Sequence, residues 1–422
     1  MSARAVIAPR ALMRGRACGA PARAVALLLG AGVATPLAAQ DRLVGARQVA
    51  TGALGEHVRF KGLLRLDQEG RGDSVQVREL VQFQLPFTAA VPMGPNWTLD
   101  VGTYYTATQV TLADAGRTRT VNLAGPGDTR VRAVGRLRDD GLVVTLGLNA
   151  PSGMRQLTTD ALDVLRVASA PALGLGSAPV SAGLGATLGV VAARGSDAGG
   201  VAAGASYEVR ARYQPVAARL LGTTPAQYTP GGAVRVTLAG ERRLGSHKLV
   251  VNLAGDLFLE DILESGTGAD VVRATVRPGP LLSAEGELQL AAPGVRELSL
   301  WTLVRRRQPF ERDGGALVGS EATYVDGGVR ASIPLLSRLD VTTALDARWQ
   351  SGMRVAPGVL TMGGVAGVGT LGLSWRSGSS TIQPFVRAQG GNLRQRLGPD
   401  VAPVADGDFF GMTFGLLFSR SF

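Results

Sequence analysis

The chain has 422 residues, of which 45% are hydrophobic, 18% are charged and 58 are glycine. This hydrophobic content excludes an intrinsically disordered protein, while the charged fraction lies below the quarter or so that is usual for soluble domains. The formal net charge is +11, and five of the arginines lie within residues 1–40. A single large barrel is compatible with this length and with glycine at nearly twice its usual share of about 7%.

Residues 1–40 have the order of a secretory signal peptide. Five arginines and no acidic residue come first, then an apolar run at 24–34, then small residues up to Gln40. The run of about 11 residues is too short to span a bilayer as a helix. We expect cleavage after Ala39 or Gln40, which also removes Cys18 and leaves a mature chain without disulfides or thiolate metal sites. Residues 41–55 are expected to form a short periplasmic or plug segment, followed by a barrel at 56–422.

Most of the chain after this point alternates apolar and polar residues. In the last segment Phe414, Leu416 and Phe418 share one face, whereas Thr413 and Ser419 share the other. Alternation with a period of two is typical of a strand with one apolar and one wet face. Because the pattern recurs along the chain, we expect an all-β protein.

Connections of two lengths separate the alternating segments. The strands are expected at 56–67, in hairpins at 74–111, 127–150, 180–215, 231–259, 279–307, 319–350 and 363–391, and at 408–422. Turns within hairpins are short, as at Gly245-Ser246, and connections between hairpins are long, as at 112–126 and 216–230. This asymmetry predicts an antiparallel transmembrane β-barrel of about 16 strands, with 14 or 18 within boundary error, and one short helix in a loop.

The wet faces of these strands are unusually basic. If the segments close into a barrel, these side chains face the lumen, where they either bias ion passage or pair with acids and only fill space. Lumen-facing side chains are expected at Arg130, Arg132, Arg136, Arg210, Arg212, Arg235, Glu208, Glu241, Asp256 and Arg348. Acids are interleaved and stacking aromatic residues are absent from the basic clusters, so nucleic-acid binding is not expected.

Residues 154–168 break the period-two pattern. Leu157, Leu162 and Leu165 recur at helical spacing, and Thr158 or Thr159 is placed to cap a helix. The helix belongs to a long connection, so it either constricts the pore mouth or packs on the outer rim.

The last segment resembles the assembly signal of Gram-negative outer-membrane proteins, whose final strand alternates and ends in Phe. Phe414, Leu416, Phe418 and Phe422 carry the resemblance. It implies an integral protein of the cell outer membrane that contacts membrane lipid and lipopolysaccharide and is inserted by the barrel-assembly machinery.

A narrower resemblance spans about 30 residues. Gly127-Asp128-Thr129, followed by 141–149 and Pro151-Ser152-Gly153, is similar to a strand pair of the long-chain fatty-acid and aromatic-hydrocarbon transporter barrels. In that family an N-terminal plug enters the lumen and hydrophobic cargo leaves sideways through the wall. Residues 41–55 offer only a short plug.

The residues of common enzyme and metal sites are scarce. His57 and His247 are the two histidines, and they do not have metal-ligand spacing. No cofactor and no enzymatic activity are expected. We expect a channel or transporter for passive uptake of small solutes or hydrophobic compounds. The alternatives are a non-transporting structural or adhesive barrel and, third, an outer-membrane lipid hydrolase.

Overall fold

A computed structural model describes most of the chain. The described residues are 48–62, 65–67, 74–114, 117–137, 141–168, 170–214, 227–265, 271–356, 359–361, 363–396 and 403–422. The expected signal peptide, Cys18 and residues 41–47 lie outside them.

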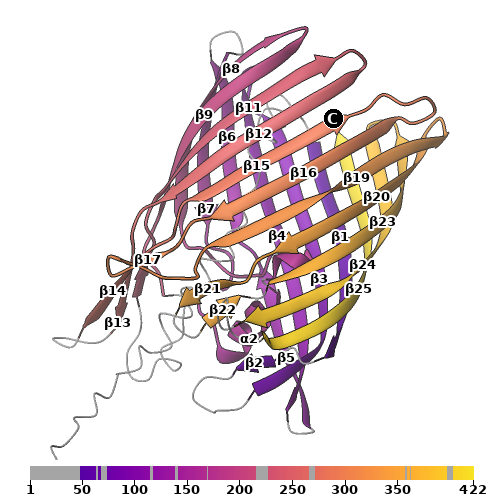
Figure 1. Ribbon diagram of the computed structural model, residues 1–422. Helices are drawn as coiled ribbons and strands as arrows, with labels where there is room; N and C mark the ends of the chain where they lie inside the picture. The colour runs from indigo at the N-terminus through magenta and orange to yellow at the C-terminus, as the bar shows by residue number, and fades with distance from the viewer. Residues whose placement is uncertain are drawn as a thin grey trace, which may run out of the picture.

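The protein folds into a closed antiparallel barrel of 16 strands (Figure 1). The wall consists of β1 (Gln48–Gly62), β3 (Ser74–Pro92), β4 (Trp97–Asp114), β5 (Arg117–Pro126) with β6 (Thr129–Leu137), β7 (Leu142–Ala150), β8 (Gly185–Ser196), β9 (Gly199–Arg210), β11 (Ala233–Leu244), β12 (His247–Phe258), β15 (Leu281–Gln289), β16 (Glu297–Arg307), β19 (Ala322–Leu336), β20 (Leu339–Gln350), β23 (Gly363–Ser377), β24 (Ser380–Arg396) and β25 (Pro403–Ser421). β5 and β6 count as one wall strand, because both pair with β4 along successive stretches. β1 pairs with β3 on one side and with β25 on the other, which closes the ring.

Smaller elements lie in the long connections. β2 (Arg65–Asp67) extends the pairing of β3, and β21 (Met353–Ala356) pairs with β22 (Val359–Thr361). A separate loop sheet consists of β10 (Gln227–Thr229), β13 (Asp261–Ser265), β14 (Val272–Arg277), β17 (Glu311–Arg312) and β18 (Gly315–Ala316). The helices are α2 (Thr159–Ala168) and the short 3₁₀ helix η2 (Pro171–Leu173).

The all-β barrel predicted from the sequence is confirmed, with two corrections. The expected connection at 112–126 contains β5, because its alternating residues extend the hairpin with β4. The wall starts at Gln48 and not at residue 56, because residues 48–55 pair with both neighbouring strands. Those eight residues are therefore not a plug.

The barrel has a turn end and a loop end. At the turn end lie tight hairpin turns such as Gly245-Ser246, and Gln48 lies opposite Ser421 there. At the loop end lie α2 and the loop sheet, whose strands β13, β14 and β17 project at the lower left of Figure 1. The expected asymmetry between short turns and long connections is present.

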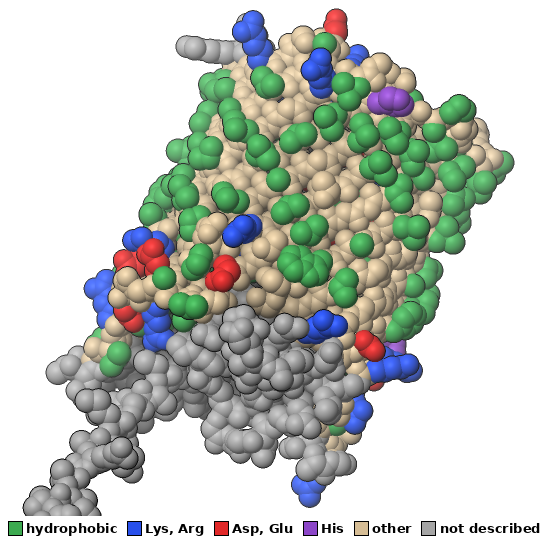
Figure 2. Space-filling model, in the orientation of Figure 1, with side chains coloured by type: hydrophobic (Ala, Val, Ile, Leu, Met, Phe, Trp, Pro, Cys, Tyr) green, Lys and Arg blue, Asp and Glu red, His purple; other side chains and the backbone are tan. Residues whose placement is uncertain are grey.

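Apolar side chains cover the outer face of the wall. Val81, Phe83, Leu85 and Phe87 alternate along β3 and are exposed, and Leu345 on β20 exposes 64% of its surface. Figure 2 shows apolar side chains spread over the middle of this face, with most charged side chains toward the two ends. A closed ring leaves no unpaired strand edge in hydrocarbon, so this outer surface suits a lipid bilayer. The fold is that of an outer-membrane β-barrel.

No helix among the described residues is long and apolar enough to cross a membrane.

The final strand has the expected faces. Phe414 and Leu416 point outward and are exposed, and Phe418 occupies the same face with partial burial. Phe422 follows the end of β25 and exposes 69% of its surface, with the guanidinium carbon of Arg420 at 5.1 Å from its ring centre. Their role as an assembly signal stays a prediction.

Candidate functional site

One side of the barrel has an apolar inner face near the loop end. Val58, Leu80, Val110 and Val121 are successive register partners on β1, β3, β4 and β5, and all four are buried. Partners directly opposite each other in an antiparallel pair share a face, so these residues form a continuous inward-facing row. An apolar row on the lumen side is unfavourable in contact with water, so another segment must pack against it.

The segment that packs against the row is the connection between β7 and β8, residues 151–184, which we call the inner segment. Its Leu157 and Leu165, together with Val164, are buried in one cluster with the inward row. Leu162 is partly buried against the same cluster. Because the helix packs on inward-facing residues, it lies inside the barrel and not on its outer rim. That the helix constricts the pore stays a prediction.

Polar contacts fix the start of α2. The Thr158 hydroxyl accepts a hydrogen bond from the Ala161 N–H at 3.1 Å, which caps the helix as predicted. The helix therefore begins at Thr159, directly after the first of the two threonines predicted to cap it. Arg119, which points inward from β5, donates to Asp160 at 3.1 Å and to Asp163 at 2.9 Å. These acids lie near the helix N-terminus, where the helix dipole favours negative charge.

Beyond α2 the inner segment crosses part of the lumen. At one side the Ala172 N–H donates to the Gln350 side chain on β20 at 2.5 Å. At the other side the Gly176 N–H donates to the Gln82 side chain on β3 at 2.7 Å. Four strands, β23, β24, β25 and β1, lie between β20 and β3 in the wall. The segment is therefore a chord across the barrel.

Two further hydrogen bonds fasten the chord to β4. The Thr106 hydroxyl donates to the Ser177 carbonyl, and the Tyr104 hydroxyl donates to the Ala178 carbonyl, both at 2.9 Å. Residues from β3, β4 and β20 thus satisfy backbone groups of a segment that has no strand partner of its own on that stretch. Groups of this kind are costly to bury without partners, so the contacts hold the chord in place.

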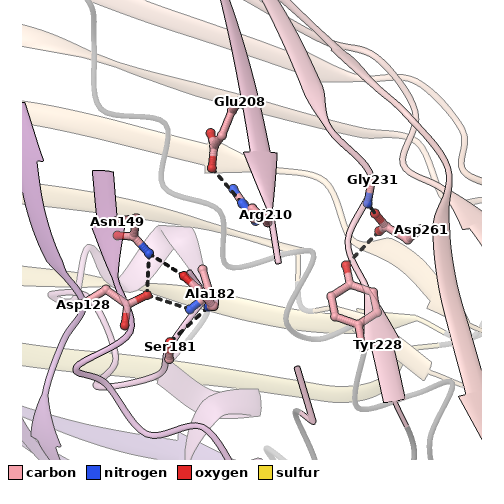
Figure 3. Close-up of polar contacts among 10 residues, drawn as sticks. Asp128, Asn149, Ser181, Ala182, Glu208, Arg210, Tyr228, Gly231 and Asp261 are labelled. Atoms are coloured by element: carbon pink, nitrogen blue, oxygen red, sulfur yellow. Dashed lines mark hydrogen bonds and ion pairs between the residues drawn. The ribbon is translucent and has the colours of Figure 1, made fainter. Parts of the chain in front are cut away.

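Asp128 anchors both ends of the inner segment. This buried carboxylate accepts a hydrogen bond from the Gly153 N–H at 3.1 Å, near the start of the segment. It accepts another from the Ala182 N–H at 2.8 Å, near the end of the segment (Figure 3). The Asn149 side-chain amide donates to it at 2.8 Å. Between these points Met154 and Val180 form a parallel bridge.

The residues beside Asp128 explain the glycines of the motif. The ring of Tyr104 lies against Gly127, where an added Cβ would be 2.0 Å from the ring Cζ atom. At Gly153 an added Cβ would be 2.9 Å from the Ser181 nitrogen. Only glycine permits both close approaches. The Gly-Asp and Pro-Ser-Gly elements, which carry the narrower resemblance, therefore form one joint.

The wall pairing changes at this joint. β4 pairs with β5 from Tyr105 to Asp114 and with β6 from Trp97 to Gly102. β6 also pairs with β7, whereas β5 has no second strand partner within the described part of the chain. The connection that follows β7 turns inward here instead of extending the wall.

Most of the expected lumen residues do lie on the inner face. Arg132 donates to Asp100 at 2.9 Å, Arg235 to Asp256 at 2.5 and 2.8 Å, and Arg348 to Asp326 at 3.3 Å. The same face contains the pairs Arg210 with Glu208, at 2.7 Å, and Lys248 with Glu241, at 2.6 Å. Arg136 occupies this face too, next to the turn end.

Arg130 and Arg212 differ from these pairs. Arg130 faces the lumen from β6, is exposed there, and has no ion-pair partner in the described part of the chain. Arg212 corrects the expectation, because it lies beyond the end of β9 and its guanidinium bonds Glu264 of the loop sheet at 2.5 Å. It belongs to the loop end and not to the lumen wall.

The loop sheet has a buried polar contact near the same end (Figure 3). The Tyr228 hydroxyl donates to Asp261 at 2.9 Å, and the Gly231 N–H donates to the other carboxylate oxygen at 2.6 Å. Burial raises the pKa of Asp261 to about 6 from its ordinary value of 3.8, although both hydrogen bonds and Arg210 oppose the shift. Burial also raises the pKa of Tyr213, which stacks edge-on against Tyr228, to about 12.

Some inner-face residues were not among the expected site residues. Trp301 on β16 and Phe385 on β24 face inward beside Arg330 and Arg387, at 4.2 and 5.8 Å from guanidinium carbon to ring centre. The alternation Leu300, Trp301, Thr302 indicates that Trp301 faces the lumen. It does not indicate which side chain the Trp301 ring contacts there.

Neither a protein-family model nor a curated protein sequence matches the chain. Among solved structures it is similar to OprB of Pseudomonas putida, at 11% identity over 89% of this chain and 93% of that chain, with a TM-score of 0.41. It is also similar to the toluene transporter TodX of P. putida, at 10% identity over 89% and 90% of the two chains, with a TM-score of 0.40. A third similar structure is OpdK of Pseudomonas aeruginosa, at 8% identity over 89% of this chain and 100% of that chain, with a TM-score of 0.39.

Proposed function

We propose that the protein is a passive outer-membrane channel for small solutes, narrowed by the inner segment. The observation that carries the proposal is the chord from Gln350 to Gln82, held by hydrogen bonds inside a closed barrel. A barrel of 16 strands is wide enough for water unless its interior is filled. The chord narrows such a lumen, and a fixed constriction selects solutes by size and charge.

The route we propose runs along the wall opposite the chord. The inward residues of β9, β11, β12 and β15 include charged pairs such as Arg235 with Asp256, and polar residues such as Asn252. Within the described residues, the chord at 170–178 makes its hydrogen bonds to β3, β4 and β20 and none to this wall. A charged, hydrated surface therefore borders the space beside the chord.

We propose a mild anion preference for this route. Arg130, Arg305, Arg330 and Arg387 point inward without a carboxylate at ion-pair distance within the described chain. Guanidinium groups that are not in an ion pair attract anions and repel cations in a narrow lumen. The orientation that fits has the turn end in the periplasm, with residues 1–40 removed as a signal peptide.

Conductance decides between the channel and the sealed barrel. Purified protein in a planar bilayer under a KCl gradient should give stepwise conductance and a reversal potential of the sign for chloride preference. Liposomes that contain the protein should also swell in solutions of small neutral sugars. No conductance and no swelling would support the structural or adhesive barrel, and turnover of phospholipid or ester substrates would support the hydrolase.

The break in the wall favours a second candidate, lateral release of hydrophobic compounds into the membrane. Within the described residues β5 has no second strand partner beside the joint at Asp128, to which the inner segment is hydrogen-bonded. Uptake of an uncharged aromatic hydrocarbon by cells that produce the protein tests this candidate. Equal uptake with and without the protein would contradict it.

A further inference from the structure

Two inward arginines of the barrel have no hydrogen-bond acceptor among the residues that the structure describes. The guanidinium carbon of Arg330 on β19 lies 4.2 Å from the ring centre of Trp301, and that of Arg387 on β24 lies 5.8 Å from the ring centre of Phe385. Neither side chain forms a hydrogen bond or ion pair in the described part of the chain. A guanidinium that rests on an aromatic face keeps its in-plane N–H donors available.

Arg348 on β20 adds a third donor group. Its Nε donates to Asp326 at 3.3 Å, whereas its buried Nη1, like the Oδ1 atom of the same aspartate, has no partner among the described residues. Gly174 of the inner segment lies against this group, since a Cβ added there would lie 1.9 Å from Nη1. The side chain is only 12% exposed, so water reaches it poorly. A buried donor in this state is costly for the protein to maintain.

The neighbouring carboxylates are already engaged. Asp346 accepts from the Trp301 indole N–H at 3.0 Å, and Glu56 accepts from the Gln389 amide at 2.7 Å. Asp326 accepts from the Tyr324 hydroxyl at 2.9 Å as well as from Arg348. Each acid thus has a donor within the protein, although the Oδ1 atom of Asp326 has no partner in the described part of the chain. Of the three arginines only Arg348 has a carboxylate partner among the described residues, so Arg330 and Arg387 are the two that an added acceptor would satisfy.

The register places small side chains between the two free arginines. Arg330 is opposite Ala344, Ala344 is opposite Thr370, and Thr370 is opposite Arg387. Adjacent strands lie about 4.8 Å apart, so the two arginine Cα atoms are separated by about 14 Å. Two arginine side chains can approach one small molecule from its two sides across this distance. Arg387 also interacts electrostatically with Arg330 and Arg348.

We propose that Arg330, Arg348 and Arg387, with Trp301 and Phe385, form a binding site for a small organic monocarboxylate that has a flat apolar body. We call it the arginine site. A carboxylate matches the fork of a guanidinium with two parallel hydrogen bonds, and the two rings border an apolar body. Asp326, Asp346 and Glu56 add negative charge close by, which disfavours a multiply charged phosphate. This inference rests on the proposed function for the route by which the solute arrives.

Benzoate is the probe, with acetate, benzyl alcohol and inorganic phosphate for comparison. Calorimetric titration of the full chain in detergent should show saturable benzoate binding that is tighter than binding of acetate or phosphate, and no binding of benzyl alcohol. Arg387→Gln and Arg330→Gln should each weaken benzoate binding about tenfold, the usual effect of losing a charge-assisted hydrogen bond. The control Arg243→Gln removes an inner-face charge on β11 near the turn end, and should change binding less than about twofold.

Heat-modified electrophoretic mobility of each variant checks that it folds, and Arg387→Lys keeps the charge without the fork. Partial recovery by lysine supports the site. Equal weakening by Arg243→Gln, tighter phosphate than benzoate binding, or no benzoate binding by the unaltered protein overturns it. Conductance of the same samples separates the two proposals. A protein that conducts without binding benzoate overturns only the site, and one that binds without conducting overturns only the channel.

Discussion

Arg119 on β5 and Asp163 on α2 form an ion pair of 2.9 Å between the barrel wall and the inner segment. The Asp163 side chain is only 4% exposed, whereas Asp160, the other partner of Arg119, is 58% exposed. One guanidinium thus makes a buried and a surface contact with the same helix. The two contacts differ in what their loss costs, because a buried carboxylate left without its cation is far less tolerable than an exposed one.

Arg119→Ala is expected to loosen α2. Removing the guanidinium should lower the free energy of unfolding by about 1–3 kcal/mol, since Asp163 stays buried. Asp160→Asn is the matched control and should cost less than about 1 kcal/mol. Urea unfolding followed by tryptophan fluorescence measures both. Equal effects of the two substitutions would show that the buried pair has no special weight.

Asp128→Ala is expected to release the ends of the inner segment. It removes the acceptor shared by Asn149, Gly153 and Ala182, and each buried donor left without a partner costs about 1–3 kcal/mol. A mobile chord obstructs the lumen less, so mean single-channel conductance and its fluctuation should both rise. Asp128→Asn keeps one acceptor oxygen, so its mean conductance and fluctuation should lie between those of the unaltered protein and those of Asp128→Ala. Unchanged channel noise in Asp128→Ala would mean that the chord is held by other contacts.

Gly127→Ala is expected to be destabilising because the Tyr104 ring occupies the space of the new methyl group. Forced repacking of this kind costs about 1–3 kcal/mol. Gly55→Ala on β1 is the control, since nothing lies within 4 Å of a Cβ at that position. Thermal unfolding in detergent compares the two. The double substitution Tyr104→Leu with Gly127→Ala should recover part of the loss.

The loop sheet is expected to gain stability in mild acid. Burial raises the pKa of Asp261 to about 6 from 3.8, so between these values the folded sheet binds more protons than the unfolded chain. Stability is therefore greater near pH 5 and falls as the pH rises through 6. Amide hydrogen exchange of residues 227–231 and 261–265, corrected for the intrinsic rate, measures this. Asp261→Asn should remove the dependence, and stronger protection at pH 7 than at pH 5 would contradict it.

The sequence predicts the barrel well because its information is local. Alternation reports which face of a strand meets lipid, and turn residues report where hairpins reverse. The register that brings Arg235 beside Asp256 follows from a short turn at Gly245-Ser246. Thr158 caps α2 as its spacing indicates.

Long-range contacts explain what the sequence leaves open. That Asp128 meets both Gly153 and Ala182 depends on the path of a long connection through the lumen, which no periodicity encodes. For Arg212 the sequence pattern predicts the wrong place. The residue continues the alternation of β9, but it lies beyond the point where that strand leaves the wall. The arginine site likewise depends on four strands, and no motif joins Arg330 to Arg387.

The seam between β1 and β25 differs from the other joints of the wall. Gln48 lies opposite Ser421, whereas other neighbouring wall strands follow one another along the chain. Hairpins can therefore form one after another from nearby residues, but the barrel closes only when β25 pairs with β1. Loop-closure entropy makes this the least local event of folding. An unclosed sheet has two unpaired strand edges, β1 and β25, each of which can pair with another chain. Pairing of β1 with β25 therefore removes both of these sites of aggregation in one step.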